Sequence, residues 1–242
     1  MAKPNVFILG APKCGTTTLA AWLADHPQVF LCPIKEPHFF NFDFGPRRFR
    51  SLARYEKLFS HAEDFHRAII DASTAYLYSR TAVPAILHYS ERPKFIVTLR
   101  NPVDMAPSLH SQMLFNGEED IEDFELAWRL QDTRAYGDKI PKQCPDPQRL
   151  QYGDICRVGT QLARLYDRVP AAQILVLRLD SISQAPRTQY RRMLDFLELD
   201  DDGRKQFGIH NPAKKRRFPA LWKVILWSDR AILAMGTPPI RL

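Results

Sequence analysis

The most informative stretch of this chain is Asn5-Val-Phe-Ile-Leu-Gly-Ala-Pro-Lys-Cys-Gly-Thr-Thr-Thr-Leu19. Its first five residues are rich in apolar β-formers and predict a buried strand. Residues 10–15 are bounded by two glycines and predict a tight turn, and residues 16–26 carry apolar side chains at helical spacing. A strand, a glycine turn and a helix in this order direct backbone N–H groups and a positive dipole end toward an anion. The stretch therefore predicts a phosphate or sulfate cradle.

The side chains of the turn suit an anion as well. Lys13 adds a full positive charge, and the threonines that follow add hydroxyl donors. The candidate anion-binding residues are Lys13, Cys14, Gly15, Thr16, Thr17 and Thr18. An ordinary glycine-rich turn between a strand and a helix is the plainest alternative, because a glycine motif alone has a false-positive risk.

The position of the lysine bears on which anion is bound. A nucleotide triphosphatase P-loop reads G-x-x-x-x-G-K-[ST]. Gly10 and Gly15 keep that separation here, but Thr16 stands in the place of the lysine, and Lys13 precedes the second glycine. The displaced lysine argues against a P-loop kinase or NTPase, which stays open as an alternative.

A second anion motif follows a strongly apolar strand predicted over 94–99. Arg100-Asn-Pro-Val-Asp-Met-Ala-Pro-Ser108 places Asn101 as a helix cap and Pro102 at the first helical position. Arg100 at the strand end can bind a phosphate with two hydrogen bonds, and Ser108 lies two turns into the helix. An arginine alone would more often form a structural ion pair, yet two anion motifs at strand ends together favour phosphate contact.

The loop Pro33-Ile-Lys-Glu-Pro-His-Phe-Phe-Asn41 carries two titratable side chains, Glu36 and His38, among apolar neighbours. Such surroundings are expected to raise the pKa of Glu36 toward the range of a general base. The alternative is that Glu36 forms a surface ion pair with Lys35 or an arginine.

These three motifs resemble those of sulfotransferases that use 3′-phosphoadenosine 5′-phosphosulfate (PAPS). Pro-Lys-x-Gly-Thr-Thr-x-Leu is similar to the family's 5′-phosphosulfate loop, and the motif that begins at Arg100 resembles its 3′-phosphate motif. Lys-Glu-Pro-His-Phe-Phe resembles the catalytic loop of the carbohydrate, heparan sulfate type enzymes. The resemblance extends over residues 5–216.

The resemblance implies in-line transfer of a sulfuryl group from PAPS to a hydroxyl of a sugar or small-molecule acceptor, leaving adenosine 3′,5′-bisphosphate (PAP). Glu36 would be the base, His38 would lie beside it, and Lys13 would stabilise the leaving group. Arg100 and Ser108 would hold the 3′-phosphate, and no metal would be required.

The chain departs from the family at two positions. Asn41 stands where these enzymes commonly have an aspartate, and Met105 where many have an arginine. Pro107 is expected to kink its helix. After a strand predicted over 68–71, Ser73 and Tyr76 either contact a ligand or serve as satisfied loop polar groups, and we favour the second.

The remaining pattern predicts one α/β domain over 1–242, a P-loop-like three-layer α/β/α fold with a central parallel sheet flanked by helices. Further strands are expected over 28–32 and 173–178, and further helices over 81–89, 122–131, 152–169 and 187–199. A long loop over 132–151 is expected to border the acceptor site.

The net charge of +7 is a local feature. Residues 214–242 hold seven Lys/Arg against one acid, so a basic nucleic-acid-binding protein is a weak alternative. By the resemblance, a basic loop over 211–217 with Lys214, Lys215 and Arg216 covers the coenzyme, and a solvated patch or a contact with nucleic acid or anionic lipid stays open. A helix over 218–235 would cap the core or form a homodimer. A membrane-surface helix is a further alternative, but the segment lacks the charge-rich polar face expected of one.

Three features bear on the expected compartment. No segment reaches the roughly 18 apolar residues of a membrane span, and since the N-terminus runs into the first predicted strand, we expect no signal peptide. The four cysteines show no Cys-x-x-Cys pair and no zinc spacing. A cytoplasmic protein with reduced thiols is the expectation.

Overall fold

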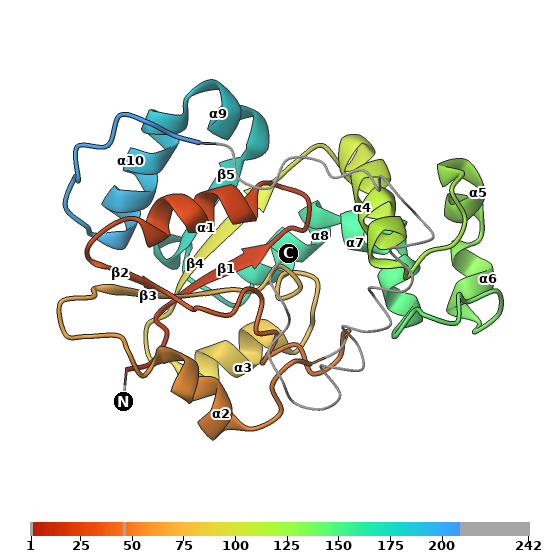
Figure 1. Ribbon diagram of the computed structural model, residues 1–242, viewed down its shortest axis with the longest axis horizontal. Helices are drawn as coiled ribbons and strands as arrows, with labels where there is room; N and C mark the ends of the chain where they lie inside the picture. Colours follow the sequence, from red (N-terminus) through yellow and green to blue (C-terminus); the bar gives the residue numbers. More distant parts are fainter. Residues whose placement is uncertain (1, 46, 209–242) are drawn as a thin grey trace.

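A five-stranded parallel sheet lies at the centre of the computed structural model, which describes residues 2–45 and 47–208 (Figure 1). The strand order is β2-β3-β1-β4-β5, so the first strand lies in the middle. Every pairing of neighbouring strands in this sheet is parallel. The strands are β1 (Val6–Gly10), β2 (Val29–Leu31), β3 (Ala68–Ala72), β4 (Lys94–Leu99) and β5 (Ile174–Arg178).

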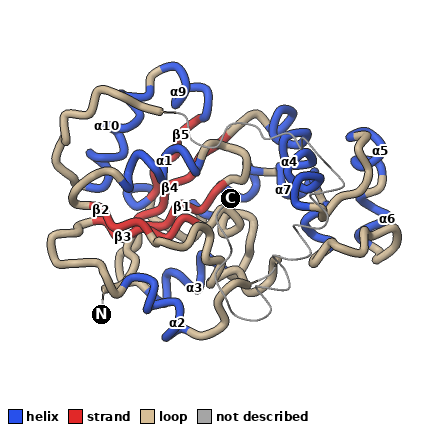
Figure 2. Tube along the Cα trace, in the orientation of Figure 1, coloured by secondary structure: helices blue, strands red, loops and turns tan. Residues whose placement is uncertain are grey.

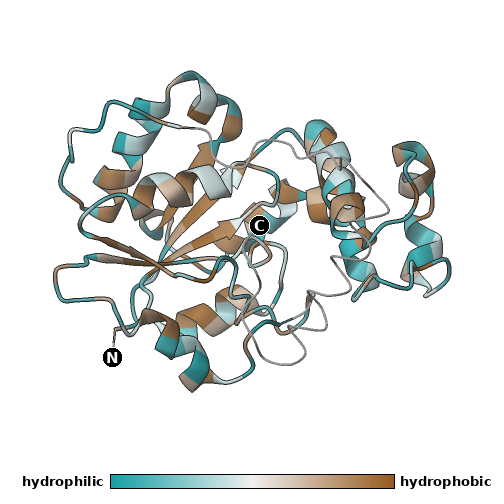
Figure 3. Ribbon diagram, in the orientation of Figure 1, coloured by the Kyte–Doolittle hydropathy of each residue, from teal (hydrophilic) through white to brown (hydrophobic). Residues whose placement is uncertain are grey.

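Helices cover both faces of the sheet. One face carries α1 (Thr16–Ala24), α9 (Leu179–Gln184) and α10 (Pro186–Leu197). The other carries α2 (Leu52–Glu56), η1 (Lys57–Phe59), α3 (Ala82–Tyr89), α4 (Pro102–Asn116) and α8 (Val158–Tyr166). Because successive strand residues point to opposite faces, Val6 and Ile8 of β1 enter the first core and Phe7 and Leu9 the second. Strands buried on both faces are mostly apolar, and brown predominates in the sheet in Figure 3, with the buried Asp71 of β3 as an exception.

A group of short helices extends from the sheet beside α4 (Figure 2). It consists of α5 (Phe124–Arg129), α6 (Gln131–Ala135), η2 (Pro147–Leu150) and α7 (Tyr152–Cys156), and η3 (Ala171–Gln173) then leads into β5. An ion pair with both side chains fully buried, Arg134 to Glu119 at 2.6 Å, holds this group together. The Tyr152 hydroxyl donates to the same carboxylate at 2.7 Å, which ties α6 to α7.

The predicted three-layer α/β/α architecture is confirmed, with every predicted strand present within one or two residues. The start of α4 also follows the prediction. Asn101 is the cap, its side chain accepts from the Val103 N–H at 3.0 Å, and Pro102 is the first helical residue. Pro107 lies inside α4, which continues through it.

The helix predicted over 152–169 is instead two helices, α7 and α8, that break at Arg157. The Gln161 side chain explains the break. Its amide donates to the carbonyls of Asp154 at 3.1 Å and Ile155 at 3.0 Å, so carbonyls at the end of α7 are satisfied without a continuing helix. Periodicity in the sequence does not report such a side-chain contact.

The prediction for 122–151 was also partly wrong. The expected single helix is divided into α5 and α6, and the expected structureless loop contains most of α6 and the turn η2. Arg134 is the reason that the chain is ordered here, because its buried guanidinium also reaches the carbonyl of Lys139 at 3.3 Å. The helix α9 lies between the strand predicted over 173–178 and the helix predicted over 187–199, and it was missed.

Some predictions fall outside the described residues. They are the basic loop over 211–217, with Lys214, Lys215 and Arg216, and the helix over 218–235. Within the described ranges, no helix combines the length and apolarity needed to cross a bilayer, and no three His, Cys, Asp or Glu side chains cluster as metal ligands would.

Candidate active site

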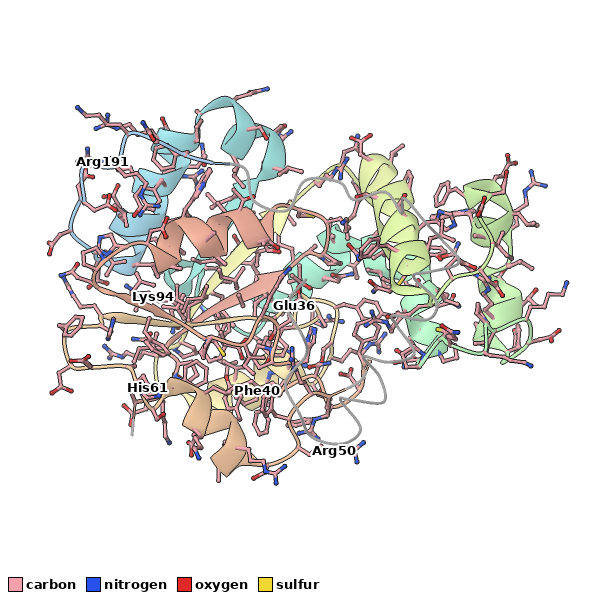
Figure 4. All side chains as sticks on the ribbon, viewed as in Figure 1. Glu36, Phe40, Arg50, His61, Lys94 and Arg191 are labelled. Atoms are coloured by element: carbon pink, nitrogen blue, oxygen red, sulfur yellow. The ribbon has the colours of Figure 1, made fainter. Side chains whose placement is uncertain are left out.

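The site lies at the carboxyl edge of the sheet, where three loops meet. Residues 11–15 follow β1, residues 73–78 follow β3, and Arg100 follows β4. The neighbouring strands β1 and β4 lead to helices on opposite faces, α1 and α4. Such a divergence leaves a crevice at the strand ends, which is where parallel α/β sheets bind ligands. Figure 4 labels Glu36 in this region and Phe40 in the layer toward α2.

The turn after β1 takes its shape from two glycines. Gly15 caps α1 at φ 85°, and a Cβ there would lie 2.8 Å from Leu179 Cδ1. Gly10 has φ 130°, and a Cβ there would lie 2.4 Å from the Thr74 carbonyl oxygen. Both positions therefore require glycine. The N–H groups of residues 15–17 have no carbonyl one turn earlier in α1, so they can receive an anion.

The side chains of this turn divide into two groups. Cys14, Thr16 and Thr18 are buried, whereas Lys13 and Thr17 are partly exposed. Burial raises the pKa of the Cys14 thiol to about 12, so it stays protonated at neutral pH. Cys14 can therefore contribute to an anion site only through its backbone.

Lys13 connects the two predicted anion motifs. Its backbone carbonyl accepts from Arg100 Nη1 at 3.4 Å, and its ammonium donates to Gln112 Oε1 on α4 at 3.1 Å. Ser108 lies one turn before Gln112 on α4 and is half-buried. The structure thus brings Lys13 and Arg100, which are far apart in sequence, to adjacent strand ends as predicted.

Glu36 and His38 form a hydrogen-bonded pair. Glu36 Oε2 lies 3.0 Å from His38 Nε2, and the two side chains are 30% and 17% exposed. Burial acts to raise the pKa of Glu36, but the hydrogen bond and charge of His38, with Lys35 and Thr74, hold the pKa below its ordinary value. The predicted upward shift was therefore wrong in direction. Glu36 is ionised at neutral pH, which is the form that a base requires.

All three predicted catalytic residues have left-handed backbone conformations. The φ angles are 62° at Lys13, 54° at Glu36 and 51° at His38. Non-glycine residues rarely adopt this region, and such strain concentrates at functional sites.

Comparison with known proteins decides the family. A family model described as "Sulfotransferase domain" matches residues 3–214. The chain belongs to the sulfotransferase family. Two curated relatives are similar. The chain is 32% identical over 197 residues to the mouse (Mus musculus) heparan sulfate glucosamine 3-O-sulfotransferase 3A1, and 33% identical over 122 residues to the human (Homo sapiens) enzyme 3B1.

These matches cover 81% and 50% of this sulfotransferase chain, but only 46% and 30% of the relatives, so the chain spans less than half of their length. The crystal structure of a sulfotransferase from Alicyclobacillus acidocaldarius superposes with a TM-score of 0.74. It is 24% identical, and the superposition covers 98% of both chains. This likeness supports the same fold.

Asn41, which replaces the aspartate common in the family, is not exposed to the site of this sulfotransferase. It is 1% exposed, and its amide donates to the Phe44 carbonyl within its own loop. Ser73 and Tyr76 are buried and hydrogen-bonded to Asp71, which agrees with the structural alternative for them.

Sequence reasoning missed Asp71, Thr74 and Gln112. Asp71 was assigned only to a strand, although a carboxylate within an apolar strand is itself a signal, because a buried charge requires partners. Gln112 and Thr74 carry no comparable signal. A separate apolar recess of about 650 Å³ between α4, α5 and α7–α8 shares no lining residue with the predicted site.

Proposed function

We propose that this chain is a PAPS-dependent sulfotransferase that transfers a sulfuryl group to a hydroxyl of a carbohydrate or small-molecule acceptor. The observation that carries the proposal is the contact of Arg100 Nη1 with the Lys13 carbonyl, 3.4 Å long, which joins two anion-binding loops at adjacent strand ends. PAPS has a phosphosulfate at one end and a 3′-phosphate at the other, so a two-part anion site suits it.

The residues at this edge of the sheet suit such a coenzyme. The N–H groups of residues 15–17, Lys13 and Thr17 would bind the 5′-phosphosulfate, since they combine dipole, charge and hydroxyl donors. Arg100 and Ser108 would bind the 3′-phosphate. Lys214, Lys215 and Arg216 stay part of the proposal as residues that cover the coenzyme.

In the proposed reaction the acceptor oxygen attacks sulfur opposite the phosphate oxygen. The new O–S bond forms as the old one breaks, Glu36 takes the hydroxyl proton, and the bond electrons leave with PAP. Lys13 and the α1 amides stabilise the negative charge that develops on the leaving oxygen. His38 holds the carboxylate of Glu36 in place. The phosphate leaving group is good, so we propose that no metal is required.

The acceptor class rests on the resemblance of residues 35–40 to carbohydrate enzymes and on the named relatives, which are heparan sulfate glucosamine 3-O-sulfotransferases. Four unpaired cysteines support a reducing, cytoplasmic location. A single domain over 1–242, a homodimer through the C-terminal segment and the absence of nucleic-acid binding belong to the same proposal.

A P-loop kinase or NTPase is the second candidate. Thr16 stands at the position where a P-loop requires a lysine, and it is only 7% exposed. Both facts disfavour a kinase or NTPase. Thermal shift with three ligands separates the candidates: PAP, ATP with magnesium, and duplex DNA. Only PAP should raise the melting temperature, because a ligand stabilises the native state that binds it. Stabilisation by ATP with magnesium alone would contradict the proposal.

A further inference from the structure

A carboxylate is buried at the centre of the sheet. Asp71 lies near the end of β3, opposite Phe7 of β1, and is 0% exposed. A buried carboxylate is costly unless hydrogen bonds satisfy it. Three hydroxyls donate to it: Ser73 Oγ to Oδ1 at 2.7 Å, and Tyr55 OH and Tyr76 OH to Oδ2 at 2.8 and 2.9 Å.

Two of these three hydroxyls also hold the loop that contains Glu36. The His38 N–H donates to Ser73 Oγ at 3.1 Å, and the Phe39 N–H donates to the Tyr76 hydroxyl at 3.0 Å. The Phe40 N–H approaches the same hydroxyl at 3.4 Å. These backbone N–H groups belong to residues 38–40, which follow Glu36 and Pro37 in the same loop.

The carboxylate determines the direction of these hydrogen bonds. A hydroxyl has one proton to donate and lone pairs with which to accept. With that proton directed to Asp71, the oxygens of Ser73 and Tyr76 can only accept from the loop amides. An asparagine in place of Asp71 would present N–H donors to the hydroxyls of Ser73 and Tyr76. A hydroxyl that accepted from such a donor would turn its own proton toward the loop N–H, and the hydrogen bond to the loop would be lost.

The loop needs this support because its backbone is strained. Glu36 and His38 both have left-handed φ angles. A non-glycine residue in this region carries backbone strain and persists only where its surroundings fix it.

We propose that Asp71 is a positioning residue for Glu36: through Ser73 and Tyr76 it fixes the backbone at residues 38–40 and so directs the base at the acceptor. This inference rests on the proposed function for its catalytic consequence. Its structural part, the fixing of the loop amides, stands on the hydrogen bonds alone.

Tyr76 and Tyr55 provide a matched pair of variants. Both hydroxyls donate to Asp71 Oδ2, and both side chains are fully buried. Only Tyr76 also accepts from the loop. Phenylalanine keeps both rings, including the stacking of residue 55 on Phe39 at 4.4 Å between ring centroids.

The first measurement is steady-state transfer from labelled PAPS to the best acceptor of a hydroxyl panel. Tyr76→Phe should lower kcat by about 10- to 100-fold, as expected for a displaced catalytic group, and Asp71→Asn should do the same. The KM for PAPS and the affinity for PAP should stay within about twofold, since the cradle keeps its contacts. Tyr55→Phe should keep kcat within about threefold of wild type. Equal kcat in the two tyrosine variants would overturn the proposal.

The second measurement, amide hydrogen exchange, does not depend on enzymatic activity. Hydrogen exchange of the His38, Phe39 and Phe40 amides should be faster in Tyr76→Phe than in Tyr55→Phe or wild type. Equal protection in both variants would overturn the positioning role, even if Asp71→Asn fails to fold. If the wild-type chain transfers no sulfuryl group, the proposed function fails, and the exchange rates still decide whether this network holds the loop.

Discussion

The ammonium of Lys13 lies 3.1 Å from Oε1 of Gln112, one turn beyond Ser108 on α4. A second hydrogen bond orients the Gln112 side chain, because its Nε2 donates to Asn116 Oδ1 at 2.9 Å. Asn116 in turn donates to Glu118 Oε1 at 3.2 Å. The helix that would bind the 3′-phosphate therefore also directs the lysine of the phosphosulfate loop.

Removal of Gln112 should impair transfer. In Gln112→Ala the lysine loses an oriented acceptor, and hydrogen bonds to charged groups are worth about 1.5–3 kcal/mol. We expect kcat to fall by about tenfold. Ser111→Ala on the same helix, whose hydroxyl donates only to the Pro107 carbonyl, is the control and should keep its rate. A Gln112→Ala enzyme as fast as this control would show that Lys13 needs no partner on α4.

The pH dependence of transfer should reflect the lowered pKa of Glu36. A base with a depressed pKa is ionised above that pKa, so the rate is retained down to mildly acidic pH and is lost only as the pH falls through it. The acid limb of kcat/KM should therefore lie below the ordinary glutamate value of about 4.3. His38→Gln removes the main group that lowers the pKa and should shift the limb upward. A wild-type limb above the ordinary glutamate value would contradict the assignment of Glu36 as a base with a lowered pKa.

Gly10 should tolerate no side chain. A Cβ would lie 2.4 Å from the Thr74 carbonyl oxygen in a backbone region that side chains rarely adopt. Gly10→Ala should lower the free energy of unfolding by more than about 2 kcal/mol in urea titrations. Gly159 of α8 is the control, because a Cβ there meets nothing within 4 Å. Gly159→Ala should raise stability by about 0.5–1 kcal/mol, and an opposite order of the two variants would refute the packing argument.

The buried ion pair of Arg134 and Glu119 should make stability pH-dependent. Burial acts to raise the pKa of Glu119, but hydrogen bonds from Arg134 and Tyr152 hold it below its ordinary value. A carboxyl with a depressed folded-state pKa stabilises the protein above its unfolded pKa, and this stability is lost as the pH falls through the folded one. Glu119→Gln should cost about 3–5 kcal/mol at pH 7, because it leaves Arg134 unpaired, and less at pH 3. A constant cost across this range, measured by urea unfolding, would contradict the assignment.

Local patterns were sufficient to predict the sheet, its layers and the first helix turns of α1 and α4. Apolar strands, glycine turns and the cap at Asn101 each depend on residues that are adjacent in the sequence. The break at Arg157 and the order of the chain after α6 were not predictable, since they depend on the side chains of Gln161 and Arg134 reaching backbone carbonyls several residues away.

The candidate site shows the same difference between local sequence patterns and contacts that form only on folding. Lys13, Glu36, His38 and Arg100 belong to contiguous motifs, and the structure places them at one sheet edge. The direction of the Glu36 pKa shift was wrong because apolar neighbours in sequence do not reveal that His38 folds back onto the carboxylate at 3.0 Å. The carboxylate of Asp71 within an apolar strand was a signal in the sequence, but its partners, Ser73, Tyr76 and Tyr55, are identified only by the structure.

The most direct test of the account is transfer of labelled sulfate from PAPS by the wild-type chain and by Glu36→Gln. Calorimetric titration of both with PAP, and of the exposed control variant Glu91→Gln, provides the matched binding data. We expect transfer by wild type and by Glu91→Gln, equal PAP affinity in all three, and a loss of at least about 100-fold in kcat for Glu36→Gln alone. Full activity of Glu36→Gln would contradict the central claim that Glu36 is the base.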